Sequence, residues 1–312
     1  MNRRLFPFLP LTALLALSTA FASPSENKAL VTRLTNEFFN AGRLDITDQI
    51  VAPNYIQHAL GIANGREALK VSTAEVRTAF PDLHYTIEQL VSDGEYVAAR
   101  FTITGTHRAP YMGINATNKS VSVASINIWR IQDGQLTEHW EVTDTLALLT
   151  QLGVLPANNP ASTSSSRPAT LTRAGTPAQS KRLVLDLFMK VFNAHNVNAA
   201  DVIFPVNYIQ HNPAVSQGLA GFKTYFKELF IAFPDAMWRL DDVVAKGDLI
   251  FVRNTISGTH RGAFGGIPAT NKRVEFASMD VFRVEDGKLV EHWDVPDNFA
   301  LLSQLGVIPS AK

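Results

Sequence analysis

The strongest constraint on the fold of this chain is an internal repeat. Residues 28–156 align with residues 181–309 at a constant offset of 153, without a gap, and about 56 of the 129 aligned positions are identical. Identity this high at one fixed offset indicates a tandem duplication of a module of ordinary domain size. The shared motifs include NYIQH (54–58 and 207–211), FPD (80–82 and 233–235), GTHR (105–108 and 258–261), ATNK (116–119 and 269–272), EHW (138–140 and 291–293) and QLGV (151–154 and 304–307).

The repeat divides the chain into two domains, which we expect at residues 23–156 and 181–312. The segment between them, 157–180, is rich in Ala, Ser, Thr and Pro and nearly lacks large apolar residues, which is typical of a flexible linker. A random coil of this length spans roughly 25–30 Å. We therefore expect the modules to pair through their sheets, either as a pseudo-dimer within one chain or in a homo-oligomer.

The first 22 residues are typical of a cleaved signal peptide rather than of a folded element. Arg3 and Arg4 precede an apolar stretch at 5–17, and Ala20-Phe21-Ala22 fits the small-x-small cleavage pattern before Ser23. The apolar stretch is too short to span a bilayer comfortably. The sequence therefore predicts a periplasmic or secreted protein without a membrane anchor.

Charge and cysteine content exclude several classes of protein. The chain has 28 Lys and Arg against 28 Asp and Glu, and it has no Cys. Zero net charge without a strongly basic stretch argues against a nucleic-acid partner, because such binding needs clustered cations. The absence of Cys excludes a disulfide framework, a catalytic thiol and a Cys-ligated metal. No His-x-His or His-Glu-x-x-His spacing occurs either, so we expect no metal.

Hydrophobic periodicity predicts the same order of elements in both modules. An amphipathic helix comes first, with apolar residues four apart at 30, 34 and 38 and at 183, 187 and 191. A short helical or turn segment leads to the NYIQH motif, and a second helix covers about 65–79 and 218–232. Four strands follow at 83–92, 96–107, 120–131 and 135–143, and a short helix at 146–152 closes the module. Helices followed by an antiparallel meander indicate an α+β fold with a pocket between helices and sheet.

In these motifs and their order, both modules resemble the SnoaL-like polyketide cyclases. The resemblance rests on Tyr-Ile-Gln-His, Phe-Pro-Asp, Gly-Thr-His-Arg, Asp-Gly-(Gln/Lys)-Leu, Glu-His-Trp-(Glu/Asp)-Val and the terminal Gln-Leu-Gly-Val. That family belongs to the nuclear-transport-factor-2-like superfamily. The resemblance implies two tandem cone-shaped domains, each a curved, mostly antiparallel sheet packed on N-terminal helices.

The last hairpin of the second module places a candidate catalytic group on one face of the sheet. A type I turn with Gly287 in a bulge would pair Val284 with Lys288, and hence Asp280 with His292 and Ser278 with Asp294. Alternation along the strands then puts these last four side chains on one face. A two-residue turn would shift this pairing and break this set.

A carboxylate in an apolar pocket has a raised pKa and is a useful general base at carbon, without any cofactor. The family resemblance implies the same chemistry: an Asp on the last strands serves as acid and base in an aldol ring closure. In this sequence the matching residue is Asp294, with Asp297 as the competitor. His292 and Asp280 would assist, by donating to a developing enolate and by orienting the ring.

The first module differs at these positions, with Ser125, Asn127, His139 and Glu141. If one module is active, we therefore expect it to be the second. Further candidates contact substrate without reacting, and Trp140 and Trp293 are assigned to packing. The candidate substrate-binding residues are Tyr208, His211, His260, Tyr55, His58, His139, Glu141 and Asn127.

Two functions remain open at the level of sequence. The first is a cofactor-free cyclase or isomerase acting on a small hydrophobic carbonyl compound. The alternative is a non-catalytic periplasmic carrier or sensor that holds such a ligand in the same cavity, which the predicted export favours. A Ser hydrolase and a dinucleotide enzyme are disfavoured, because Gly-x-Ser-x-Gly and Gly-x-Gly-x-x-Gly are absent.

Overall fold

The computed structural model describes residues 23–59, 61–156 and 175–308. The predicted signal peptide and most of the predicted linker lie outside these residues. Among the described residues, no helix is long and apolar enough to cross a membrane.

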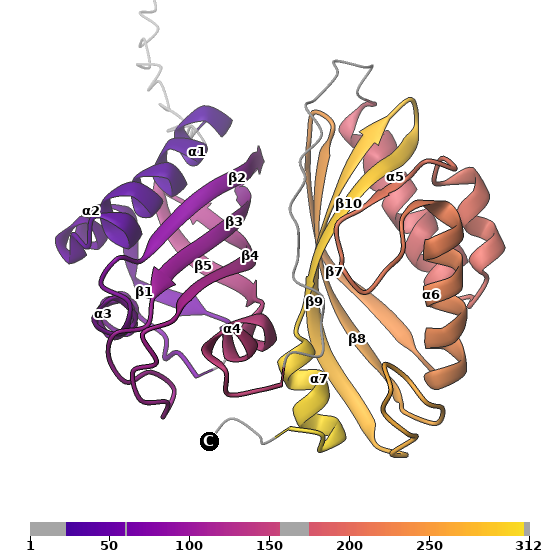
Figure 1. Ribbon diagram of the computed structural model, residues 1–312. Coiled ribbons are helices and arrows are strands. Elements are labelled where there is room, and N and C mark those ends of the chain that lie inside the picture. Colours follow the sequence, from indigo (N-terminus) through magenta and orange to yellow (C-terminus); the bar gives the residue numbers. More distant parts are fainter. Residues whose placement is uncertain (1–22, 60, 157–174, 309–312) are drawn as a thin grey trace, which may run out of the picture.

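Most helices of the first module lie on one side of its five-stranded sheet, while its last helix contacts the last helix of the second module (Figure 1). Its helical segments are α1 (Pro24–Arg33), the π-helical η1 (Leu34–Asn40), η2 (Leu44–Ile46), α2 (Thr47–Ile50), α3 (Arg66–Ala79) and α4 (Thr145–Leu152). Its strands are β1 (Val51–Gln57), β2 (His84–Asp93), β3 (Tyr96–Thr106), β4 (Ser120–Gln132) and β5 (Gln135–Thr143).

The second module repeats this arrangement. Its helical segments are α5 (Pro177–Asp186), the π-helical η3 (Leu187–Phe192), η4 (Val197–Val202), α6 (Gly218–Ala232) and α7 (Asn298–Leu305). Its strands are β6 (Ile209–Gln210), β7 (Met237–Lys246), β8 (Leu249–Thr259), β9 (Arg273–Glu285) and β10 (Lys288–Pro296). The predicted α+β fold with two tandem modules is confirmed.

Each sheet contains one strand that the sequence pattern did not predict. The strand orders are β1-β5-β4-β3-β2 and β6-β10-β9-β8-β7, with β1 and β6 parallel to β5 and β10 and all other pairs antiparallel. We expected only a helical or turn segment before NYIQH. Pro53 and Asn54 interrupt any strand pattern there, but a strand at the edge of a sheet tolerates Pro, because one side of it needs no partner.

The repeat extends further upstream than the sequence alignment indicated. Ser23 and Thr176, again 153 residues apart, cap α1 and α5, each accepting a hydrogen bond from the backbone N–H three residues on. Glu26 and Gln179 close the two capping boxes. The first helix of the second module therefore includes residues 177–180, which we expected to belong to the linker.

The two sheets face each other, so the molecule is layered as helices, sheet, sheet and helices (Figure 1). Strand β3 illustrates the cause. Val97, Ala99 and Phe101 point into the core of their own module, whereas Ala98 joins an apolar cluster that includes Phe251 and Val281 of the second module. Strands buried on both faces thus build a pseudo-dimer within one chain.

Candidate active site

The second module contains a largely apolar cavity between its helices and the concave face of its sheet. About 810 Å³ of space, including the solvent-filled mouth, lies between these walls. Polar side chains gather at the end formed by β8, β9 and β10. The aromatic part of the wall includes Phe192, Tyr225, Phe226, Trp238, Phe264 and Phe276.

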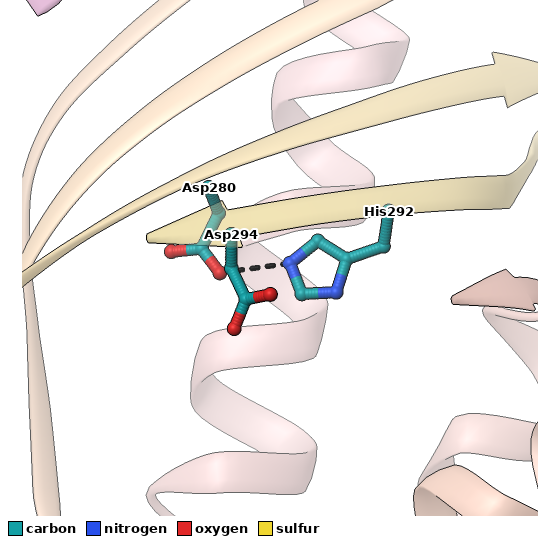
Figure 2. A group of neighbouring side chains, drawn as sticks. All are labelled: Asp280, His292 and Asp294. Atoms are coloured by element: carbon teal, nitrogen blue, oxygen red, sulfur yellow. Dashed lines mark hydrogen bonds and ion pairs between the residues drawn. The ribbon is translucent and has the colours of Figure 1, made fainter. Parts of the chain in front are cut away.

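Three titratable side chains meet at the polar end of the cavity. Asp280 comes from β9, whereas His292 and Asp294 come from β10, and their potential ligand atoms lie within 4.8 Å of one another. All three line the cavity. Figure 2 shows how they converge, with His292 hydrogen-bonded to Asp280.

The pairing predicted for this hairpin is wrong, although the predicted face is correct. Asp286 and Gly287 form a two-residue turn with positive φ at both positions, so Lys288 pairs with Glu285. A bulge between Leu289 and Glu291 then adds one residue, and Asp280 pairs with Asp294 while His292 pairs with Phe282. The turn and the bulge together shift the predicted register by two, which leaves every side chain on its predicted face.

Hydrogen bonds fix the orientation of the His292 ring. Nε2 of His292 donates to Asp280 at 2.8 Å, and Nδ2 of Asn254 donates to the other oxygen of Asp280 at 2.6 Å. On the far side of the ring, Nε2 of Gln210 lies 3.1 Å from Nδ1 of His292. The Gln210 amide is fixed in this orientation because its oxygen accepts from the backbone N–H of Asn212. The neutral ring therefore carries its proton on Nε2.

Asp294 is the one carboxyl of the group with an oxygen left free. Its Oδ2 accepts from Nδ2 of Asn212 at 2.8 Å. Its Oδ1 has no hydrogen-bond partner within the described part of the chain. Burial is the main cause that raises the pKa of Asp294, and the charge of Asp280 raises it further, while His292 and Asn212 oppose the shift. A carboxylate with a raised pKa is a stronger base than an ordinary aspartate, which suits it to take up and return a proton.

The pKa of His292 is also raised. Burial lowers it, but the hydrogen bond to Asp280 and the charges of Asp294 and Asp280 outweigh burial. The same hydrogen bond bears on metal binding. A metal on Nε2 would displace the proton that Asp280 accepts, and moving that proton to Nδ1 would set it against the amide N–H of Gln210. As it is hydrogen-bonded, the cluster is organised for proton transfer.

The other predicted residues of the second module lie outside this group. Asp297 caps α7, accepting from the N–H of Ala300 at 2.9 Å. Tyr208 is buried, and its hydroxyl lies 3.3 Å from the amide nitrogen of Gln210, so it supports the site indirectly. His211 packs on Trp293, away from the large cavity. His260 lies 3.2 Å from the Thr270 hydroxyl, in the loop after β8.

The first module holds the equivalent residues in a different electrostatic state. His139 donates to Asn127 at 2.8 Å and lies 2.8 Å from the side-chain amide of Gln57. Burial, with a smaller effect of His58, lowers the pKa of His139 to about 3. Burial raises the pKa of Glu141 to about 7. The ring is thus neutral, and an amide replaces the carboxylate that faces the ring in the second module.

The remaining two candidates of the first module are separated by the sheet. Tyr55 is fully buried and lies near His139, with 6.3 Å between ring centroids. His58 stacks on Trp140 and pairs with Glu138 at 2.8 Å. The pairs His58–Trp140 and His211–Trp293 therefore occupy matching places in the two modules.

Sequence reasoning missed several partners of Asp294 and Asp280. These are Asn212, Asn254 and Tyr225, the last of which lines the cavity and has its pKa raised by burial and by the charge of Asp294. The signal was available in the repeat. At the offset of 153, the first module has Ala59, Phe101 and Ser72 at these positions. At these three positions the second module has a polar side chain that the first module lacks or replaces by a smaller one.

The fold and the cavity define a class of α+β proteins in which helices and a five-stranded sheet surround a largely apolar cavity. Within that class, the family model of the SnoaL-like polyketide cyclases matches residues 29–152 and 182–305. This chain therefore belongs to that family and contains two copies of its domain.

The curated relatives that the chain resembles include two methyl ester cyclases. The chain is 29% identical over 119 residues to the nogalonic acid methyl ester cyclase of Streptomyces nogalater, covering 37% of this chain and 89% of the relative. It is 27% identical over 132 residues to the aklanonic acid methyl ester cyclase DnrD of Streptomyces peucetius, covering 39% and 90%. Among solved structures, TsrD of Streptomyces laurentii is 28% identical with a TM-score of 0.41, covering 43% of this chain and 99% of that one.

Proposed function

We propose that this chain catalyses cofactor-free acid–base chemistry at carbon, namely ring closure or isomerisation of a small hydrophobic carbonyl compound in the second module. The observation that carries the proposal is the free oxygen of Asp294 in an apolar cavity, on a carboxyl whose pKa burial raises. The curated relatives named above are cyclases, which supports the reaction class.

Proton transfer through Asp294 accounts for each step. Its Oδ1 removes a proton from the carbon next to a carbonyl, and the electron pair of that C–H bond becomes an enolate. In a ring closure the enolate carbon forms a C–C bond to a second carbonyl carbon. The resulting alkoxide then takes the proton back from Asp294, so the reaction needs no oxidant or reductant.

The surrounding side chains prepare Asp294 for this role. Asn212 holds its other oxygen, which aims the free one. Tyr225 has a hydroxyl that can donate to the enolate oxygen, and the aromatic wall keeps water away. Asp280 and Asn254 hold the ring of His292 beside the reacting carboxyl.

Exchange of α-carbon hydrogen for deuterium tests the proposal without knowledge of the product. A panel of 1,3-dicarbonyl compounds and aromatic ketones is incubated in heavy water and followed by NMR. We expect exchange with the wild type and with Glu141→Gln, the matched change in the first module. Asp294→Asn should reduce exchange at least a hundredfold while remaining folded. Full exchange with Asp294→Asn would exclude Asp294 as the base.

The same experiment separates the enzyme from a carrier. Ligands that shift in the NMR spectrum but do not exchange with any form of the protein would favour the non-catalytic binding protein. Exchange that depends on Asp294 would exclude it.

We further propose that the chain is exported to the periplasm after cleavage behind Ala22. The basic residues and the Ala-x-Ala pattern support this. Ser23, the first residue after the cut, is the N-cap of α1, so cleavage there leaves the capping box intact. N-terminal sequencing of protein from a periplasmic extract should begin at Ser23. Full-length protein confined to the cytoplasm would contradict the proposal.

A further inference from the structure

Trp293 lies between two residues of the candidate site but points to the opposite face of the sheet. His292 and Asp294 line the cavity, whereas Trp293 is buried in the apolar cluster that joins the two modules. Alternation along β10 requires this arrangement. A packing contact on the Trp293 ring therefore helps to position β10, the strand that carries the candidate base Asp294.

The first module supplies a cation to this ring. The guanidinium carbon of Arg100, on β3, lies 5.2 Å from the centroid of Trp293. Its Nε donates to Gln89 at 2.7 Å, which holds the side chain in place. Arg100 is buried, and burial lowers its pKa. A cation with so little water around it binds an aromatic face more strongly than an exposed one does.

The contact continues from Trp293 into the segment that hydrogen-bonds the site. The ring of Trp293 stacks on His211, with 4.6 Å between centroids and 5° between planes. The neighbours of His211 point the other way, where Gln210 bonds His292 and Asn212 bonds Asp294. The contact between the rings of Trp293 and His211 lies on the face of the sheet towards the first module. It thus sets the spacing of the hydrogen-bonded pairs on the cavity face, Gln210 with His292 and Asn212 with Asp294.

The first module contains the equivalent cation–π contact, but there it does not lead to a hydrogen bond on a carboxyl group. Arg253 of the second module lies 5.1 Å from the centroid of Trp140, which stacks on His58. The residue after His58 is Ala59, which has no side-chain donor for Glu141. Both modules therefore have the Arg–Trp–His contact, but only in the second module is it connected to a hydrogen-bonded carboxyl, that of Asp294.

Resting on the proposed function, we infer that the first module is a built-in positioning partner for the second: Arg100 acts through Trp293 and His211 to hold Asn212 against Asp294. Arg100 touches neither the cavity wall nor the reacting groups, so it is a positioning residue. This inference also gives the duplication a mechanical role, because the first module supports the strand that carries Asp294 although it contributes no residue to the cavity wall.

Arg100→Met and Arg253→Met test the inference as a matched pair in the full chain. Each removes one guanidinium from the interface and keeps a flexible apolar chain of similar length. We expect Arg100→Met to lower kcat for α-carbon exchange about tenfold with KM within about twofold, since loss of alignment affects the reaction more than binding. Arg253→Met should leave kcat unchanged. Arg100→Lys should restore part of the loss.

A second readout does not depend on activity. Weakening the Asn212 hydrogen bond removes an effect that lowers the pKa of Asp294, so the carboxyl should titrate at higher pH in Arg100→Met. Carbon-13 NMR of Asp-labelled protein measures this, with Asp294→Asn identifying the signal. Equal effects of both Met variants on kcat, or an Asp294 titration that Arg100→Met does not move, would overturn the inference. Unchanged exchange in Asp294→Asn would refute the proposed function, while the titration would still test the coupling.

Discussion

Glu141 makes the stability of the first module depend on pH in a direction opposite to that of most carboxyl groups. Burial raises its pKa from 4.5 to about 7. Between these values the unfolded chain releases the proton that the folded chain retains. Unfolding therefore releases a proton, and rising pH favours the unfolded state. The stabilising effect of the retained proton is complete below pH 4.5 and is lost as pH rises to about 7.

The magnitude follows from the size of the displacement. Each pH unit between the two pKa values contributes about 1.4 kcal/mol. Because 28% of the Glu141 side chain is exposed, we discount the full value and expect about 2–3 kcal/mol.

Glu141→Gln isolates this contribution, because glutamine has nearly the same shape and does not titrate. Urea unfolding followed by tryptophan fluorescence gives the free energy of unfolding of both proteins from pH 4 to 8. The variant should gain about 2–3 kcal/mol relative to the wild type across this range. His139 titrates in both proteins and cancels in the difference. Stability curves that stay parallel from pH 4 to 8 would refute the buried, protonated state of Glu141.

Two further substitutions test assignments in the second module. Asp297→Ala should lower the free energy of unfolding by about 1 kcal/mol by removing the N-cap of α7, whereas Asp297→Asn keeps a capping oxygen. Both should retain α-carbon exchange, and its loss in the Asn variant would move the catalytic role to Asp297. Phe222→Ala should cost about 3–5 kcal/mol, since this ring is 2% exposed in the core of the second module. A loss below about 1 kcal/mol in urea unfolding would contradict that packing.

The elements that strong local patterns encode could be predicted from the sequence. Strands β2 to β5 lie within about two residues of the predicted ranges, because the Asp93-Gly94 and Asp133-Gly134 turns mark the boundary within each of the two hairpins. Strand β1 was not predicted because it contains Pro53 and because its partner, β5, lies about 80 residues later in the chain. Its edge position is a property of the assembled sheet and leaves no local signal.

The site was predictable in composition but not in geometry. Alternation placed Asp280, His292 and Asp294 on one face, and that conclusion survived a register that was wrong by two. The bulge near Val290 is a backbone feature, and the residues there carry no sequence signal that predicts it. Asn212 was missed because it lies in the irregular segment after β6, and only the fold brings it to Asp294.

The two copies share the Arg, Trp and His contacts of their interface but differ at several cavity positions. Arg100 is matched by Arg253, Trp140 by Trp293 and His58 by His211. The cavity set differs at Asn127, Glu141, Ala59, Phe101 and Ser72, which replace Asp280, Asp294, Asn212, Asn254 and Tyr225.

A pseudo-twofold interface needs both halves to remain alike, because each Arg must meet a Trp of the other module. A cavity that faces away from that interface carries no such constraint. The first module could therefore lose the amide and carboxylate partners of its acid while still serving as the surface on which the second module is held in shape.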